Sequence, residues 1–249
     1  MKVSLFITCL TDTFYPHAGQ AVVDVLRRCG CEVEFPRGQT CCGQPMFNNG
    51  YHREAADLAR RMIDLFDDAE HIVTPSGSCC AMVREHYPRL LPGDARCEAF
   101  VNRTYEFVEF LHKVLKVDLR AMGCRGHGSA TYHYSCHLRG LGMTDEAVQL
   151  LKQIEGLEYR ALERMDQCCG FGGTFAVKFP QVSGAMVEDK VACLRATGAE
   201  VLVCNDGGCA MNISGALHRA GVDMRVMHIA ELISQGWNEP QASGMTNVQ

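Results

Sequence analysis

The chain has 249 residues, of which 47% are hydrophobic and 21% are charged, and its formal net charge is −5. These proportions are typical of a soluble globular protein of one or two domains, and the acidic balance argues against a general nucleic-acid-binding protein. No stretch approaches the ~18 consecutive apolar residues of a membrane span, and the apolar part of the N-terminus is too short for a signal peptide.

Hydrophobic periodicity predicts alternating strands and helices along the whole chain. In the first half the expected strands are 3–8, 32–35 and 71–74, and the expected helices are 20–28, 54–66, a helix starting at Cys79, and 106–115. In the second half the expected strands are 130–134, 158–162, 200–203 and 224–227, and the expected helices are 145–154, 186–197, 209–219 and 229–235. This alternation favours an α/β fold with small, mostly parallel sheets and flanking helices. Residues 238–249 show no apolar period, and we expect them to be disordered.

The cysteines, 15 in number, form an internal repeat. One cysteine is followed, after 31 residues, by an adjacent pair and a glycine, and this pattern occurs twice at a shift of 127 positions. A fourth cysteine follows each pair, at a shift of 130 positions. The eight repeated cysteines are Cys9, Cys41, Cys42 and Cys79 in the first half and Cys136, Cys168, Cys169 and Cys209 in the second. We therefore predict two pseudo-symmetric modules, 1–117 and 130–237, joined by a linker at 118–129.

The repeated cysteines indicate metal or redox chemistry. Without an export signal we expect a cytoplasmic protein with reduced thiols. The first cysteine of each half follows its first strand and the fourth follows its third strand, which places both at the ligand-binding edge of a parallel sheet. Four converging thiolates suit tetrahedral zinc or an iron–sulfur cluster. Adjacent cysteines favour a cluster, because two neighbouring side chains rarely reach one small ion but can reach different irons.

Several other residues carry weaker signals. Five isolated cysteines are expected to be structural core residues: Cys29, Cys31, Cys97, Cys124 and Cys193. Cys80 and Cys204 each adjoin a motif and are possible spare ligands, but neither has a counterpart in the other half. His133 and His137 flank a motif cysteine and either interact with a cluster or have a structural role. Asp206 is expected to cap a helix, with iron ligation as the alternative.

The double repeat resembles the cysteine-rich CCG domain found in heterodisulfide reductase and its relatives. It is most similar to one branch, the lactate-utilisation protein A family, over about residues 3–234. The segments that carry the resemblance are Phe6-Ile7-Thr8-Cys9-Leu10, Gln39-Thr40-Cys41-Cys42-Gly43-Gln44-Pro45, Pro75-Ser76-Gly77-Ser78-Cys79, Ser135-Cys136-His137-Leu138-Arg139, Cys168-Cys169-Gly170-Phe171-Gly172-Gly173-Thr174-Phe175 and Met211-Asn212-Ile213.

The resemblance implies one [4Fe-4S]-type cluster in each module, held by the eight repeated cysteines. It also implies an iron–sulfur subunit of a complex that oxidises L-lactate to pyruvate. The implied partners are a ferredoxin-like iron–sulfur subunit and a third lactate-utilisation protein. Because the sequence has no flavin or nicotinamide signature, we expect the chain to carry electrons and to be inactive alone.

The chain departs from the full domain motif at one position in each module. That motif ends in C-x-x-C and gives five cysteines, whereas Ser76 and Asp206 occupy the first position of the pair here. Four thiolates fit an ordinary cluster better than a five-cysteine non-cubane cluster. A heterodisulfide or thiol–disulfide reductase and a structural zinc protein remain the alternative functions. A carboxylate substrate would need an arginine, and Arg139 is the candidate by its position.

Overall fold

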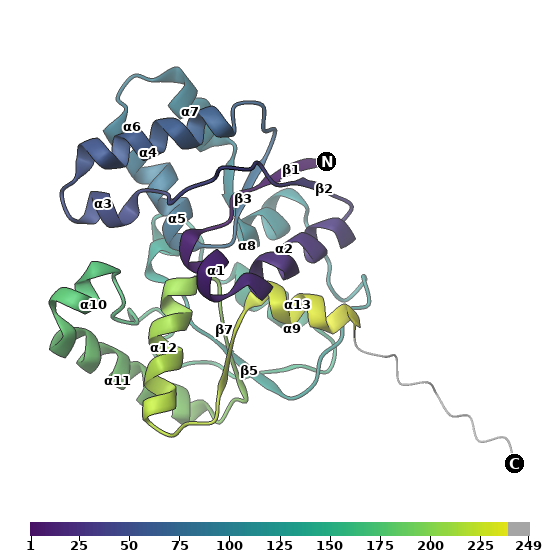
Figure 1. Cartoon of the computed structure of the whole chain (residues 1–249). Helices are drawn as coiled ribbons and strands as arrows, with labels where there is room; N and C mark the ends of the chain where they lie inside the picture. The colour runs from purple at the N-terminus through teal and green to yellow at the C-terminus, as the bar shows by residue number, and fades with distance from the viewer. Residues whose placement is uncertain (239–249) are drawn as a thin grey trace, which may run out of the picture.

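A computed structural model describes residues 1–238, which form two four-stranded, all-parallel sheets flanked by helices (Figure 1). The first sheet has the strand order β2-β1-β3-β4 and the second has the order β6-β5-β7-β8, so their topologies are equivalent. The predicted α/β class with two pseudo-symmetric repeats is therefore confirmed. Of the tail that we expected to be disordered, residues 239–249 lie outside the described residues, and Asn238 ends a helix.

The strands match the predicted positions with one exception. The first sheet contains β1 (Lys2–Leu5), β2 (Glu32–Glu34), β3 (Ile72–Thr74) and β4 (Thr104–Glu106). The second contains β5 (Ser129–Tyr132), β6 (Glu158–Tyr159), β7 (Val201–Cys204) and β8 (Arg225–His228). Strand β4 was not predicted and overlaps the start of the helix expected at 106–115. Three residues are too few to show the two-residue period of a strand, and the apolar helix that follows dominates the pattern.

The predicted long helices are present, and several short ones were missed. The first half contains α1 (Cys9–Phe14), α2 (Pro16–Arg28), α3 (Gln44–Asn48), α4 (His52–Leu65), α5 (Gly77–Ala81), α6 (Tyr87–Leu90), α7 (Ala95–Asn102) and α8 (Phe107–Glu109). The second contains α9 (Glu146–Gln153), α10 (Thr174–Lys178), α11 (Pro180–Thr197), α12 (Gly207–Arg219) and α13 (Ile229–Asn238). Helices α2 and α11 begin several residues earlier than predicted, each at a proline, whose fixed φ suits the first helical position. Among residues 1–238, no helix is long and apolar enough to cross a bilayer.

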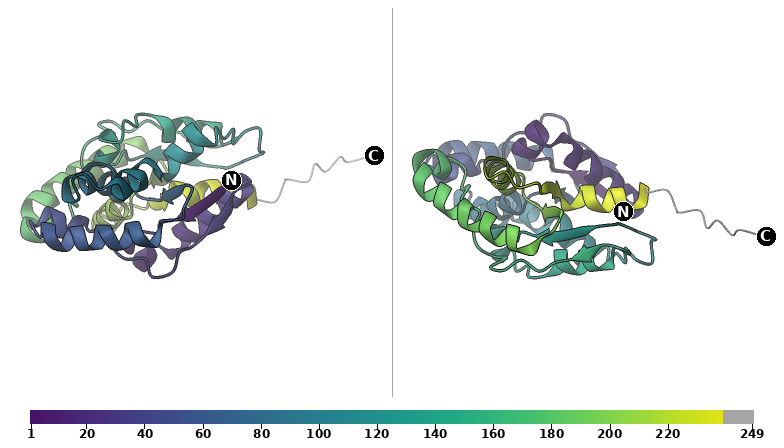
Figure 2. Two further views of the ribbon diagram at one scale, coloured as in Figure 1. Left: turned by 90° about the horizontal axis from the view of Figure 1, so that it is seen from above. Right: turned by 90° about the horizontal axis from the view of Figure 1, so that it is seen from below.

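The two sheets share a central core. One hydrophobic cluster contains Val3 and Leu5 of β1 together with Ala130 and Tyr132 of β5. The opposite faces of the sheets pack in two outer clusters, one formed by residues of the first half and the other by residues of the second. Helix α13 near the C-terminus packs beside α2 near the N-terminus (Figures 1 and 2). The halves are therefore held together by burial of apolar surface in addition to their covalent link.

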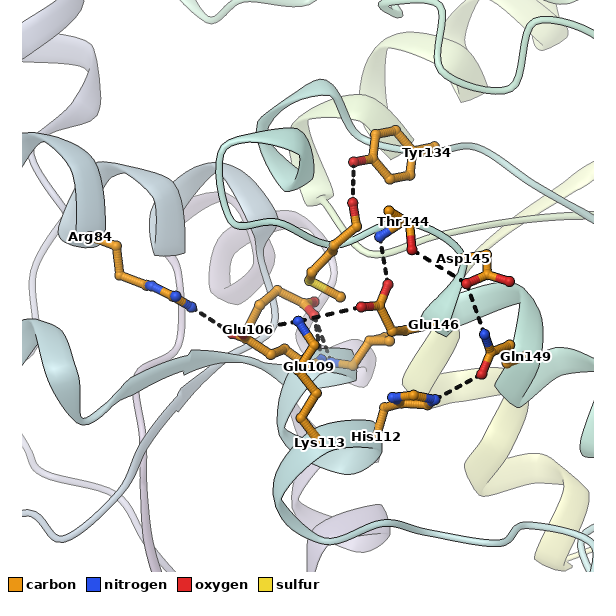
Figure 3. Close-up of polar contacts among 12 residues, drawn as sticks. Arg84, Glu106, Glu109, His112, Lys113, Tyr134, Thr144, Asp145, Glu146 and Gln149 are labelled. Carbon is orange, nitrogen blue, oxygen red and sulfur yellow. Dashed lines mark hydrogen bonds and ion pairs between the residues drawn. The ribbon is translucent and has the colours of Figure 1, made fainter.

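Polar side chains also connect the halves (Figure 3). Arg84 donates to Glu109 at 2.7 Å, and the Lys113 ammonium lies 3.7 Å from Glu109 and 3.4 Å from Glu146 of α9. Both carboxylates are buried. Lys113, which is itself exposed, thus bridges a buried carboxylate of each half.

Candidate metal centre

All eight repeated cysteines line one cavity of about 400 Å³. In each half the first cysteine begins a short helical segment after the first strand: Cys9 begins α1, and Cys136 begins a 3₁₀ turn (Cys136–Arg139). The fourth cysteine lies in the first turn of the helix after the third strand, Cys79 in α5 and Cys209 in α12. The sequence predicted convergence within each half. It did not predict that both sets face the same cavity.

Close sulfur–sulfur contacts organise the first set. The Cys9 Sγ lies 3.7 Å from the Cys41 Sγ, and the Cys42 Sγ lies 3.3 Å from the Cys79 Sγ. The adjacent cysteines therefore point to different partners. This arrangement suits a polynuclear cluster, whose separate irons accept separate thiolates.

The second set repeats one of these contacts and adds a histidine. The Cys169 Sγ lies 3.2 Å from the Cys209 Sγ, which is the counterpart of the contact between Cys42 and Cys79. A ring nitrogen of His133 and the sulfurs of Cys169 and Cys209 all lie within 4.8 Å of one another. These three buried side chains form a group that could hold a metal ion.

The neighbouring thiols hold their protons unequally. Hydrogen bonding with a neighbouring thiol is the largest cause that lowers the pKa of Cys41 to about 3, of Cys168 to about 2 and of Cys209 to about 6. The same kind of contact raises the pKa of their partners, Cys9, Cys42, Cys136 and Cys169. The thiolate is the form of cysteine that binds metals. The donors therefore fit a thiolate-ligated metal centre chemically as well as by position.

The Cys-Cys-Gly turns depend on their glycines. Gly43 and Gly170 have positive φ values, 89° and 82°. Such a conformation is strained for residues with a Cβ. The turn carries the chain away from each cysteine pair and leaves both thiols facing the cavity.

Comparison with known proteins places this geometry in a family. The model of the CCG cysteine-rich domain matches residues 3–84 and 130–214. The chain is 50% identical to lactate utilization protein A of Bacillus velezensis, over 94% of this chain and 99% of that protein. It is 48% identical to lactate utilization protein A of Geobacillus kaustophilus, over the same shares of the two chains. This chain belongs to the lactate utilization protein A family.

Solved structures resemble this family member only weakly. A glutamate racemase from Francisella tularensis aligns with 95% of this chain and 79% of its own, with 9% identity and a TM-score of 0.37. A glutamate racemase from Aquifex pyrophilus covers 96% and 83% of the two chains, with 12% identity and a TM-score of 0.36. These likenesses carry no argument about function.

The two positions that depart from the full CCG motif contact each other across the halves. The Ser76 hydroxyl donates to Asp206 Oδ2 at 3.0 Å, and the Ser78 N–H donates to the same oxygen at 2.9 Å. Each side chain also caps a cysteine-bearing helix: Ser76 Oγ accepts from the Cys79 N–H, and Asp206 Oδ1 accepts from the Gly208 N–H. The capping role predicted for Asp206 is confirmed. These hydrogen bonds join the two halves within the lining of the cavity.

We expect Ser76→Ala to retain the iron content and visible spectrum of the anaerobically purified chain. Its hydroxyl is already engaged by Asp206 and Cys79, and thiolate is the preferred donor for iron–sulfur clusters. Loss of the cap is expected to cost about 1 kcal/mol of stability. Iron and sulfide analysis beside Cys79→Ala, which removes a cavity thiol, provides the comparison. A large loss of iron from Ser76→Ala would show that this position coordinates the metal.

The two cysteines considered as spare ligands do not line the cavity. Cys80 and Cys204 are fully buried, and burial raises the pKa of both thiols. We expect Cys80→Ala and Cys204→Ala to retain the iron of the unmodified chain, measured per folded chain. A selective loss of iron from either variant would contradict this assignment.

Arg139, the candidate for holding a carboxylate, does not line the cavity. Its guanidinium pairs with Asp166 at 3.1 Å on the surface. Of the residues in 1–238 that line the cavity, none is lysine or arginine. Apart from the cysteines, His137 and Asp206 are the titratable residues of that lining. The sequence suggested Arg139 only through its proximity to Cys136, and proximity in sequence does not fix side-chain direction.

Proposed function

We propose that this chain is an iron–sulfur electron-transfer subunit that acts in the oxidation of L-lactate to pyruvate. Each module, 1–117 and 130–237, would hold one [4Fe-4S]-type cluster through its four repeated cysteines. The observation that carries the proposal is the presence of eight cysteines around one cavity, in two equivalent sets. The names of the similar proteins support the link to lactate utilisation.

The arrangement supports clusters over single metal ions. In both halves the second cysteine of the adjacent pair contacts the fourth cysteine, and a four-thiolate cluster accounts for both contacts. The group of His133, Cys169 and Cys209 is the one observation that favours zinc, and it is confined to the second half. We also propose a cytoplasmic location, because reducing conditions there keep closely spaced thiols from forming disulfides.

The cavity supports electron transfer over substrate oxidation by this chain alone. A carboxylate substrate is normally held by an arginine or lysine, and no such residue from 1–238 lines the cavity. We propose that a partner supplies the substrate site and that the electrons removed from lactate pass to this chain. The proposed partners are a ferredoxin-like iron–sulfur subunit and a third lactate-utilisation protein.

The central test is anaerobic purification followed by iron, sulfide and zinc analysis. The expected result is iron and sulfide sufficient for two clusters per chain, with little zinc. Zinc in place of iron would contradict the proposal and favour the structural alternative.

We expect the cluster-loaded chain alone to oxidise L-lactate slowly or not at all. The assay measures pyruvate formed anaerobically with an artificial electron acceptor, with and without the two partners. Partners are expected to restore turnover because they bring the missing substrate site. Rapid pyruvate formation by the isolated chain would place the substrate site here, with His133 and His137 the first residues to replace.

A further inference from the structure

Among the positions at which the two centres differ, one is buried beside the second set of cysteines. At the shift of 127 that relates Cys9 to Cys136, Phe6 corresponds to His133. Both side chains are fully buried. Phe6 packs edge-to-face against Phe66, with 6.0 Å between ring centroids, and it offers no polar atom to the first centre.

The backbone fixes the position of His133. Its N–H donates to the Val203 carbonyl at 2.9 Å, which extends the pairing of β5 with β7 by one residue. Because side chains alternate along an extended segment, the imidazole projects to the face opposite Tyr132. On that side it meets Cys169 and Cys209.

Among residues 1–238, the imidazole of His133 has no candidate hydrogen-bond partner besides the two nearby sulfurs. Neither of its ring nitrogens has a hydrogen-bond partner, although both are buried. Leaving a buried N–H unpaired costs about 1–3 kcal/mol. The sulfurs of Cys169 and Cys209 lie within 4.8 Å of a ring nitrogen of His133 and are the nearby atoms that can accept its hydrogen bond. After its bond with Cys169, interaction with His133 is a further cause of the lowered pKa of Cys209.

We propose that His133 donates its N–H to a cysteine sulfur of the second centre and makes that centre easier to reduce than the first. The inference rests on the proposed function, because it requires a cluster in each module. A hydrogen bond to a ligand sulfur stabilises the added negative charge and raises the reduction potential. Phe6 cannot make this bond. With a cluster in each module, the second would then be the preferred acceptor of an electron, and its reduction would form or break no covalent bond.

The test compares His133→Phe with His133→Gln in the full chain. His133→Phe reproduces the residue of the first module, whereas glutamine retains an N–H donor. Both are best measured in a Cys41→Ser/Cys42→Ser background, in which the second centre alone titrates. A redox titration followed by electron paramagnetic resonance gives its potential directly. We expect His133→Phe to lower that potential by about 59 mV, a tenfold change in the equilibrium constant of a one-electron step. The glutamine variant should retain most of the original value.

Two controls separate this role from others. In a Cys168→Ser/Cys169→Ser background, His133→Phe should leave the potential of the first centre unchanged. Iron content should be the same with histidine, glutamine or phenylalanine at position 133. An unchanged potential in His133→Phe would overturn the inference. A loss of iron from that variant, while it remains folded, would also overturn it, because it would show that His133 is a ligand. Absence of clusters from the unmodified chain would overturn the proposed function itself.

Discussion

Replacing Cys41 and Cys42 together with serine is expected to remove about half of the iron and leave the second centre filled. The two thiols approach Cys9 and Cys79, so their loss takes two of the four donors of the first set. The second set has its own contacts and does not need them. Iron and sulfide per chain, measured anaerobically with circular dichroism to verify folding, provide the readout.

A matched pair of variants tests the two-centre arrangement. Cys168→Ser/Cys169→Ser should remove the other half of the iron, and Cys97→Ser, a buried cysteine outside the cavity, should remove none. Because the two sets share a cavity, the alternative is a single centre held by both sets. If either double variant loses all iron while remaining folded, the eight thiols hold a single joint centre.

The repeat in the sequence determined much of this arrangement in advance. Shifts of 127 and 130 positions identified both cysteine sets, and strand alternation placed them at sheet edges. The meeting of the two sets could not be predicted, because it depends on contacts between the halves that leave no periodic signal. A Cβ on Gly77 would lie 2.7 Å from Leu138 of the other half, and one on the equivalent Gly207 would lie 3.0 Å from the hydroxyl of Thr11. Only the folded chain reveals why these positions lack side chains.

The directions of the His133 and Arg139 side chains could not be predicted from the sequence either. The sequence placed His133 and Arg139 near Cys136, and it could not rank them. Strand pairing turns His133 toward the sulfurs, whereas Arg139 ends on the surface with Asp166. The direction of each side chain is set by long-range backbone contacts that local patterns do not encode.

A second large effect is expected from Glu106→Ala, which should lower the free energy of unfolding by about 3 kcal/mol or more. The fully buried carboxyl accepts the N–H groups of Val108 and Glu109, at 2.7 and 3.1 Å, and the Asn205 amide at 3.0 Å (Figure 3 shows its surroundings). Asn205 belongs to the other half and accepts in turn from the Tyr132 hydroxyl. Alanine leaves these buried donors unpaired. Urea denaturation of the reduced, metal-free chain measures the loss.

The same carboxyl gives the stability a pH dependence. Burial is the largest cause that raises the pKa of Glu106 to about 8, from an ordinary value of 4.5. Between these values the folded chain binds more protons than the unfolded chain, so the free energy of unfolding falls as pH rises and levels off above about pH 8. The expected slope from this group is at most about 1.4 kcal/mol per pH unit. Glu106→Gln, which cannot ionise, should remove that contribution.

The control for this slope is Glu163→Gln, which changes an exposed carboxylate and should keep the pH dependence of the unmodified chain. An unchanged slope in Glu106→Gln would contradict the assignment.

Glu106 and Asn205 join the two halves, so loss of the hydrogen bond between them should loosen the cavity wall on both sides. Glu106→Ala should therefore weaken iron retention in both centres together, whereas the cysteine variants empty one at a time. That contrast separates residues that hold the modules against each other from residues that hold the metal.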